Sequence, residues 1–501
     1  MRVNYLLFVL STSALLSACS DNNNDSQADA AAEQAAVTSA LREEITQQSL
    51  SGDPSLNRIV PDASSPLAVL GMQLFYSQAL SGDMDTACVS CHHPEMGGGD
   101  NLALSIGVEA VAPLLLGPGR EHSSSGHDYD GGPTVPRNAP TTFNIALWDK
   151  AIFHDGRLES MQGTENMNGE GTSIVSPDSP DRTTPDEGTI NLTATQAMFP
   201  VTSSEEMKGH HFQEYDNEQI RQYLVERLRG ETDELVTNEW LAAFQLGLQQ
   251  PDGTAESLIT QTNMFTAIGE YERSQVFVNS PWKAFVEGDD NAIDLASKQG
   301  ALLFFKSKEE GGANCASCHK GDFFTDEQYH NIAMVQVGRG KGDGESGSND
   351  FGRFKVTQLE SDKFAFRTPS LLNIAKMGPY GHAGGYLSLE ATVRHHLNAS
   401  DAVYNYDIAA NIEQVGVQTQ EMLNNTLAAL HKLNADRNAG VEGILQDKEL
   451  NDEEIGQLIS FLHSLTDSCI ADAENTQCLA PWVPSDDIAD PDGLRLEAVM
   501  R

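Results

Sequence analysis

The chain has 501 residues, with 31 Lys and Arg against 73 Asp and Glu, which gives a formal net charge of −42 at pH 7. Such a charge repels the phosphate backbone and excludes nucleic-acid binding. The length predicts two to three domains, and a hydrophobic content of 39% is enough for buried cores. After the first residues we see no apolar run of transmembrane length.

The start of the chain has the pattern of a bacterial lipoprotein signal. A positive residue and a short apolar core precede Leu16-Ser17-Ala18-Cys19. We therefore expect residues 1–18 to be a signal peptide and Cys19 to be lipidated, which predicts a periplasmic protein anchored to the outer membrane. Residues 19–52, rich in Asn, Asp, Gln and Ala, are predicted to form a flexible tether.

Two stretches, "ACVSCHHPEMGGGD" and "NCASCHKGDFF", each contain the pattern C-x-x-C-H. This pattern is typical of covalent c-type haem attachment, in which the following histidine ligates the iron. Zinc is the rival, but zinc needs no histidine directly after the second cysteine, and the two pairs are too far apart for a zinc ribbon. The predicted attachment and proximal residues are Cys88, Cys91, His92, Cys315, Cys318 and His319. Of the other cysteines, Cys469 and Cys478 enclose a short polar loop and could form a disulfide in an oxidising compartment.

An internal repeat follows the two haem motifs. "NAPTTFNIA" from Asn138 matches "RTPSLLNIA" from Arg367, and "FHDGRLES" from Phe153 resembles "GHAGGYLSLE" from Gly381, at nearly the offset that separates the motifs. The repeat predicts one module used twice, each copy with its own haem.

Helical patterns dominate between these motifs, and strand-like alternation is scarce. The predicted helices are 216–230, 292–305, 388–398 and 451–465, the last capped by Asn451 or Asp452. We expect a mainly α fold with two cytochrome c-like haem domains related by duplication. The predicted boundaries are 53–285, with an inserted surface loop near 161–193, then 286–470, then a C-terminal tail at 471–501.

The chain resembles the bacterial di-haem cytochrome c peroxidase and MauG family over residues 55–470. The shared features are the paired CxxCH motifs with "RNAPTTFN", "FHDGR", "RTPSLLNIA", "PYGHAGG" and "EEIGQLISFLHSLT". The resemblance implies two haems of unequal potential, a calcium ion between them, and peroxide chemistry at the N-terminal haem.

The resemblance places the second axial ligand of the C-terminal haem at His396, where family members carry Met or Tyr. On a helix over 388–398, His396 lies in one apolar stripe with Leu389 and Leu397, while His395 faces away. An ordinary buried histidine is the alternative at this position. Met377 is the less favoured ligand.

At the N-terminal haem, the family's removable distal histidine falls on Val108, which cannot ligate iron. We therefore expect an open iron, with His122, His127 and His154 left as ligands by residue type alone. His154 replaces a tryptophan that the family places between its haems.

The resemblance also implies a carboxylate that moves a proton between the two peroxide oxygens. The matching segment "FPVTSSEEMKG" gives Glu206 as this base, with Glu205 as the fallback and Gln196 ten residues before Glu206. The family's Asn-Pro is missing here, and a solvated surface glutamate is the alternative.

The implied calcium ligands are the Asn138 side chain and the carbonyl oxygens of Met377 and Pro379, with water completing the oxygen shell.

These features predict a di-haem peroxidase that reduces hydrogen peroxide with electrons from a small c-type cytochrome or a cupredoxin. The acidic surface is explained either by solvation alone or by attraction of a basic donor. One alternative is a MauG-like oxidase that modifies residues of a partner protein, although Tyr is absent at 396 and no Trp precedes the second CxxCH. The other is a non-enzymatic electron carrier with both irons closed.

Overall fold

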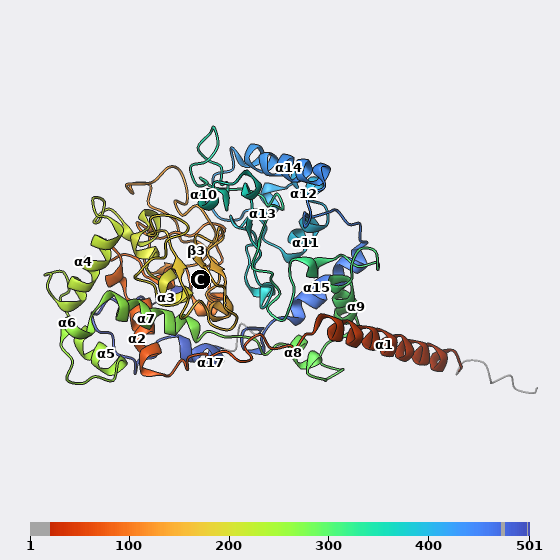
Figure 1. Cartoon of the computed structure of the whole chain (residues 1–501), viewed down its shortest axis with the longest axis horizontal. Coiled ribbons are helices and arrows are strands. Elements are labelled where there is room, and N and C mark those ends of the chain that lie inside the picture. Colours follow the sequence, from red (N-terminus) through yellow and green to blue (C-terminus); the bar gives the residue numbers. More distant parts are fainter. Residues whose placement is uncertain (1–20, 472–475, 498, 501) are drawn as a thin grey trace, which may run out of the picture.

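The computed structural model describes residues 21–471, 476–497 and 499–500. The predicted signal peptide and the lipidation site at Cys19 lie outside the described residues. Within this part, no helix is both long and apolar enough to cross a membrane. The chain is mainly helical, as predicted (Figure 1). Its strands are short and form sheets of only two or three strands.

The helices are α1 Asp21–Gln48, α2 Pro66–Tyr76, α3 Leu192–Gln196, α4 Asn217–Arg229, α5 Trp240–Gly247, α6 Ala255–Leu258, α7 Gln261–Arg273, α8 Pro281–Val286, α9 Leu295–Phe305, α10 Phe354–Thr357, α11 Leu389–Leu397, α12 Ala399–Tyr404, α13 Ile408–Asn411, α14 Met422–Ala439, α15 Asp452–Ser464, α16 Ser468–Ala471 and α17 Thr476–Leu479. The strands are β1 Leu115–Leu116, β2 Ala151–Ile152, β3 Leu158–Ser160, β4 Ile174–Val175, β5 Tyr329–His330, β6 Phe366–Arg367 and β7 Val499–Met500. β1 pairs with β7 in parallel, β2, β3 and β4 form an antiparallel sheet, and β5 pairs antiparallel with β6.

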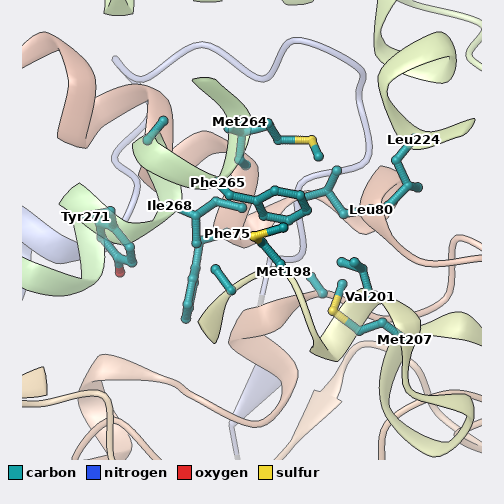
Figure 2. Close-up of a cluster of buried hydrophobic side chains, with 14 of the residues drawn as sticks. Phe75, Leu80, Met198, Val201, Met207, Leu224, Met264, Phe265, Ile268 and Tyr271 are labelled. Carbon is teal, nitrogen blue, oxygen red and sulfur yellow. The ribbon is translucent and has the colours of Figure 1, made fainter. Parts of the chain in front are cut away.

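The first domain is built around the crossing of α2 and α7. A Cβ atom at Gly71 would lie 1.9 Å from the Ala267 carbonyl oxygen, so only glycine allows the two backbones to approach this closely. The core continues to Met198 and Met207, which Figure 2 shows in one buried cluster with Phe75. These methionines flank the segments that carry Gln196 and Glu206, so both segments are anchored in the core.

In the second domain, α9 and α15 also cross at a glycine that allows their backbones to approach closely. A Cβ atom at Gly300 would lie 1.9 Å from the Gln457 carbonyl oxygen. Trp282 and Phe461 fill the core beside the crossing, with their ring centroids 5.0 Å apart. The internal duplication itself stays a prediction.

Most of the predicted helices are confirmed by their caps. α4, α11 and α15 occupy the predicted ranges, and the Asn451 side chain caps α15 by accepting a hydrogen bond from the Glu454 backbone N–H. The helix expected from 292 begins only at Leu295, because Asp294 caps it by accepting from the Ser297 N–H. Local capping chemistry therefore fixed the starts of these helices.

The prediction of a flexible tether over 19–52 is wrong across α1. This segment is a 28-residue helix whose C-terminal half packs against α9, where Leu41 is fully buried and Ile45 nearly so. Arg42 also donates to Asp290, with 2.7 Å between Nη2 and Oδ1. Figure 1 shows the other half of α1 extending away from the body. The many alanines of α1 favour a helical conformation. Its two buried apolar residues, Leu41 and Ile45, attach the helix to the second core.

The C-terminal tail crosses back to the first domain. The Leu496 N–H donates to the Tyr76 carbonyl oxygen at 2.8 Å, and the Asp492 carboxylate accepts hydrogen bonds from Ser77 and Trp240. The predicted disulfide is confirmed, because Cys469 and Cys478 are bonded at the point where the tail leaves the second domain. The ends of the chain are thus exchanged: the N-terminal helix packs on the second core and the C-terminal tail on the first.

The inserted segment 161–193 is mostly irregular, as predicted, but it is packed rather than free. β4 joins β3, and Asp178 accepts hydrogen bonds from Asn217 and Arg221 of α4 at 2.6 Å each. The predicted boundary near 285 also shifts, because α8 lies with the second core.

Two buried arginines join the domains. Arg137 donates to both oxygens of Asp350 in the second domain, at 2.7 and 2.9 Å, and to Asp155 in the first domain at 2.7 Å. Arg353, from the second domain, donates to the carbonyl oxygens of Asp155 and Gly156. Arg137 holds the pKa of Asp350 down at about 2, against the opposing effect of burial. Both carboxylates are therefore ionised and paired across the boundary at neutral pH.

The α9–α15 crossing gives a test of the second core. We expect Gly300→Ala to destabilise the protein by about 1–3 kcal/mol, because the added methyl group forces the helices apart. Gly456→Ala is the matched control on α15, since a Cβ atom there meets nothing within 4 Å. Helix propensity predicts that it stabilises by about 0.5–1 kcal/mol. Calorimetric unfolding measures the stability of both variants. Equal melting temperatures would show that the crossing tolerates a side chain.

Candidate functional site

The two CxxCH stretches adopt the same local structure in the two domains. Each pair of cysteines lies on a short 3₁₀ turn, Cys88–Ser90 and Cys315–Ser317. His92 Nδ1 donates to the Gly98 carbonyl oxygen and His319 Nδ1 to the Phe324 carbonyl oxygen, both at 3.1 Å. Because Nδ1 is used in this way, Nε2 stays available as a metal ligand. Burial lowers the pKa of both rings, that of His319 to about 4, so both are in the neutral form that ligates a metal.

At the second site, His396 faces the proximal histidine. The ring centroids of His319 and His396 are 6.5 Å apart. An iron bound by both Nε2 atoms would separate the centroids by roughly 6 Å, which is two metal–nitrogen bonds of about 2 Å plus the distance from each nitrogen to its ring centre. His396 Nδ1 also donates to a backbone carbonyl, that of Thr392 at 2.8 Å. The pair fits a haem iron held between two histidines.

His395 and Met377 lie elsewhere. Both ring nitrogens of the fully buried His395 are engaged, by the Tyr386 hydroxyl and by the Ile332 carbonyl oxygen, at 2.8 Å each. The Met377 side chain packs in a separate cluster with Phe143. Of these candidates only His396 is placed opposite His319.

At the first site, the segment with Glu206 packs against the segment with Val108. Glu205 and Glu206 lie on a single π-helical turn, Ser204–Lys208, a rare geometry that is frequent at functional sites. A Cβ atom at Gly107 would lie 2.3 Å from the Glu205 carbonyl oxygen, so the two backbones are in direct contact.

Glu206 lies beside the first CxxCH stretch. Its charge contributes to raising the pKa of the Cys91 thiol to about 12, after the larger effect of burial. Burial also raises the pKa of Glu206 itself, although the positive charges of Arg157 and Lys341 act against that shift. Ser203 Oγ donates to Glu205 at 3.4 Å, and a hydrogen bond from Ser203 also acts to lower the pKa of Glu206. The Glu206 charge therefore acts on both cysteines of the first CxxCH stretch.

Gln196 is the last residue of α3 and is partly buried. Asn191 caps this helix by accepting from the Ala194 N–H at 2.8 Å, which fixes the short helix before the π-helical turn.

The three histidines that remained possible at the first iron each keep one ring nitrogen that makes no hydrogen bond among the described residues, so the open iron stays a prediction. His122 Nδ1 donates to the Ser123 carbonyl oxygen at 3.0 Å. His127 is exposed and stacks on His210, with 3.7 Å between ring centroids. His154 Nε2 donates to the Asn138 carbonyl oxygen at 3.0 Å.

Two of the three predicted calcium ligands line a small cavity of about 10 Å³ between the domains. Asn138 and Met377 line it, together with Thr141 and Gly378, and Pro379 is not among the described residues that do so. The Asn138 Nδ2 group donates to the Leu102 carbonyl oxygen at 2.8 Å, which leaves its Oδ1 atom as an acceptor. The volume suits one water-sized occupant.

Sequence reasoning missed two residues near the first site. Lys341 comes from the second domain, and Arg157 from "FHDGR" stacks over the Phe153 ring at 3.6 Å. The motif could have pointed to Arg157, but nothing near Lys341 in the sequence marks it.

Comparisons with known proteins agree with this arrangement. A family model described as di-haem cytochrome c peroxidase matches residues 65–291. The chain is 29% identical to cytochrome c551 peroxidase of Pseudomonas aeruginosa, over 73% of this chain and 79% of that protein. It is 26% identical to the methylamine utilization protein MauG of Methylorubrum extorquens, over 70% and 72%. The fold is similar to that of a MauG-like protein associated with microbial copper homeostasis, with a TM-score of 0.52, 20% identity, and coverage of 87% and 96%.

The opposed histidines at the second site give a direct test. We expect His396→Ala to convert the second haem from low spin to high spin, because the iron loses one of two strong ligands. Electron paramagnetic resonance of the ferric protein measures this change. His395→Ala is the control, since that ring is buried but points elsewhere, and its low-spin signal should persist. A low-spin signal that survives in His396→Ala would show that another residue ligates the second iron.

Proposed function

We propose that the chain is a member of the di-haem cytochrome c peroxidase and MauG family, a peroxidase-type oxidoreductase, and that it reduces hydrogen peroxide to water. The observation that supports this most is the difference between the two sites. The second has two histidine rings 6.5 Å apart, which fits a closed iron. At the first, the position that matches the family's distal histidine is the buried Val108, and Glu206 on the neighbouring turn is half-buried. One site for electrons and one for peroxide follow from this difference.

Each site has the residues that a covalent haem requires. Cys88 and Cys91 would hold one haem and Cys315 and Cys318 the other, and all four are free of disulfides. When bound, the first haem supplies iron that binds peroxide and accepts electrons, and the second supplies an electron relay.

Glu206 performs the proton transfer in this proposal. Its carboxylate takes the proton from one oxygen of hydrogen peroxide and returns it to the other, which then leaves as water. Two further protons and two electrons convert the remaining oxygen to a second water. Burial favours this role, because it raises the pKa of Glu206 and so makes the carboxylate a stronger base. Gln196 would orient the peroxide from α3.

We also propose that calcium occupies the cavity at Asn138 and Met377. Amide and carbonyl oxygens are ligands that calcium prefers, and water would complete the shell. At the domain boundary, the ion would hold the two haem domains in register.

A periplasmic location anchored through lipid at Cys19 is part of the same proposal. The confirmed disulfide suits an oxidising compartment. The exposed half of α1 would then act as a helical spacer between the lipid and the second domain, on which α1 packs.

The Glu206→Gln variant tests the proton transfer. We expect peroxide reduction to slow by about 10²–10⁴, because glutamine keeps the size and hydrogen bonding of the residue but cannot accept the proton. In the wild type, activity should fall as pH drops through the raised pKa of Glu206, since protonation removes the base; the variant should lose that acidic limb. Stopped-flow kinetics against pH measures both.

Glu205→Gln is the matched control on the same turn and should keep near-normal activity. Normal turnover in Glu206→Gln, or a larger loss in Glu205→Gln, would assign the base to another residue. A wild-type enzyme that is inert until one electron is added would show that a ligand closes the first iron.

The acidic surface gives a prediction for the electron donor, which we propose is a small basic cytochrome c or cupredoxin. The association rate should fall on the order of 10-fold or more as salt rises, because ions screen a long-range attraction to the charge of −42. Stopped-flow mixing at increasing ionic strength measures it. An unchanged rate would leave the charge without a role in donor binding.

A further inference from the structure

Asp100 is a buried acid at the cavity to which the proposed function assigns calcium. It lines that cavity together with Asn138 and Met377. The residue is 3% exposed, and its Oδ2 atom makes no hydrogen bond within the part of the chain that the structure describes. A buried polar group without a partner is costly, and a charged group more so, because it has lost its contacts with water. We therefore expect Oδ2 to have a partner outside the protein chain.

The neighbours that act on Asp100 do not supply this partner. Burial raises the pKa of Asp100 to about 6, against smaller opposing effects of the Ser105 hydroxyl and of the charge of Arg120. The Arg120 guanidinium, however, donates to four backbone carbonyl oxygens at 2.7–3.0 Å and not to Asp100. Ser105 offers only a neutral hydroxyl. Among the described residues, no cation is therefore bound to the Asp100 carboxylate.

A single residue, Leu102, holds the side chains of Asp100 and Asn138. Its N–H donates to Asp100 Oδ1 at 3.0 Å, and its carbonyl oxygen accepts from Asn138 Nδ2 at 2.8 Å. Asp100 Oδ2 and Asn138 Oδ1 are the oxygen atoms that these two bonds leave as acceptors. Thr141, which also lines the cavity, donates from its hydroxyl to the Gly97 carbonyl oxygen at 2.6 Å. The segments that carry the two oxygens are thus already tied to each other.

We propose that Asp100 is an anionic ligand of this calcium ion, in addition to the Asn138 side chain and the Met377 carbonyl oxygen. The proposal rests on the calcium site of the proposed function. Calcium prefers oxygen ligands, and the number of charged ligands tunes its affinity. A site built only from amide and carbonyl oxygens has no charged ligand, whereas Asp100 provides one carboxylate. The ion would in turn be the partner that the buried Oδ2 atom lacks.

The Asp100→Asn variant tests this role with little change in shape. Asparagine keeps an acceptor for the Leu102 N–H but removes the negative charge, so calcium should bind more weakly, on the order of 10-fold or more. Asp85→Asn is the matched control. Asp85 also has one buried oxygen without a partner among the described residues, and its other oxygen accepts from the Glu109 N–H at 2.6 Å. Asp85 is not among the described residues that line the cavity.

The experiment uses the purified holoprotein after a chelator has removed divalent ions, with two readouts that do not depend on turnover. Isothermal titration with calcium chloride gives the affinity, and calorimetric unfolding with and without calcium gives the stabilisation on binding. We expect the wild type and Asp85→Asn to bind one calcium ion and to melt at a higher temperature with it. Asp100→Asn should lose most of this increase. Without calcium, it should be at least as stable as the wild type, because a buried charge has been removed.

Three outcomes would overturn the proposal. Equal calcium affinities of the wild type and Asp100→Asn would show that Asp100 is not a ligand. An equal loss of affinity in Asp85→Asn would show a general effect of acidic charge rather than a contact. A lower stability of Asp100→Asn without calcium would show that the carboxylate serves the fold instead.

The wild type tests the calcium site of the proposed function separately. If the wild type binds no calcium, the site is refuted and the role of Asp100 with it. If the wild type binds calcium and Asp100→Asn binds it equally well, only the role of Asp100 is refuted.

Discussion

The ion pairs of Arg137 join the two haem domains, and both candidate sites depend on the arrangement that they fix. One guanidinium donates to Asp155 in the first domain and to both oxygens of Asp350 in the second. All three groups are buried, so removing any one would leave an uncompensated charge away from water. Such a pairing tolerates little sliding between the domains.

Once the domains are joined, local backbone contacts and helix caps determine which side chains lie near each CxxCH stretch. Gly107 lets the segment with Val108 lie directly on the turn that carries Glu206. At the second site, the Ser388 cap starts α11 so that His396 projects toward His319. In the proposed function, the same attachment motif would have a proton acceptor beside it in one domain and a second ligand in the other. In that function, this difference rather than the motif would separate peroxide chemistry from electron relay.

The exchange of the chain ends adds a second link between the domains. α1 buries Leu41 in the second core, and the tail after Cys478 places Leu496 in the first core. Each end therefore stabilises the domain that is farther from it along the chain. Separation of the domains would require the tail to leave its hydrogen bonds with α2 as well as the ion pairs of Arg137.

The sequence by itself determined what depends on neighbouring residues. The CxxCH motifs, the Asn451 cap and the apolar stripe with His396 are local patterns, and they predicted the haem attachment residues, the helix start and the facing of α11. It could not predict that α1 is ordered, that the tail packs on the first domain, or that Arg137 pairs with Asp350 across the domain boundary. These features come from contacts between segments far apart in the chain, whose burial depends on how the domains pack. Hydrophobic periodicity carries no information about which distant surface will cover a residue, so only the tertiary structure decided them.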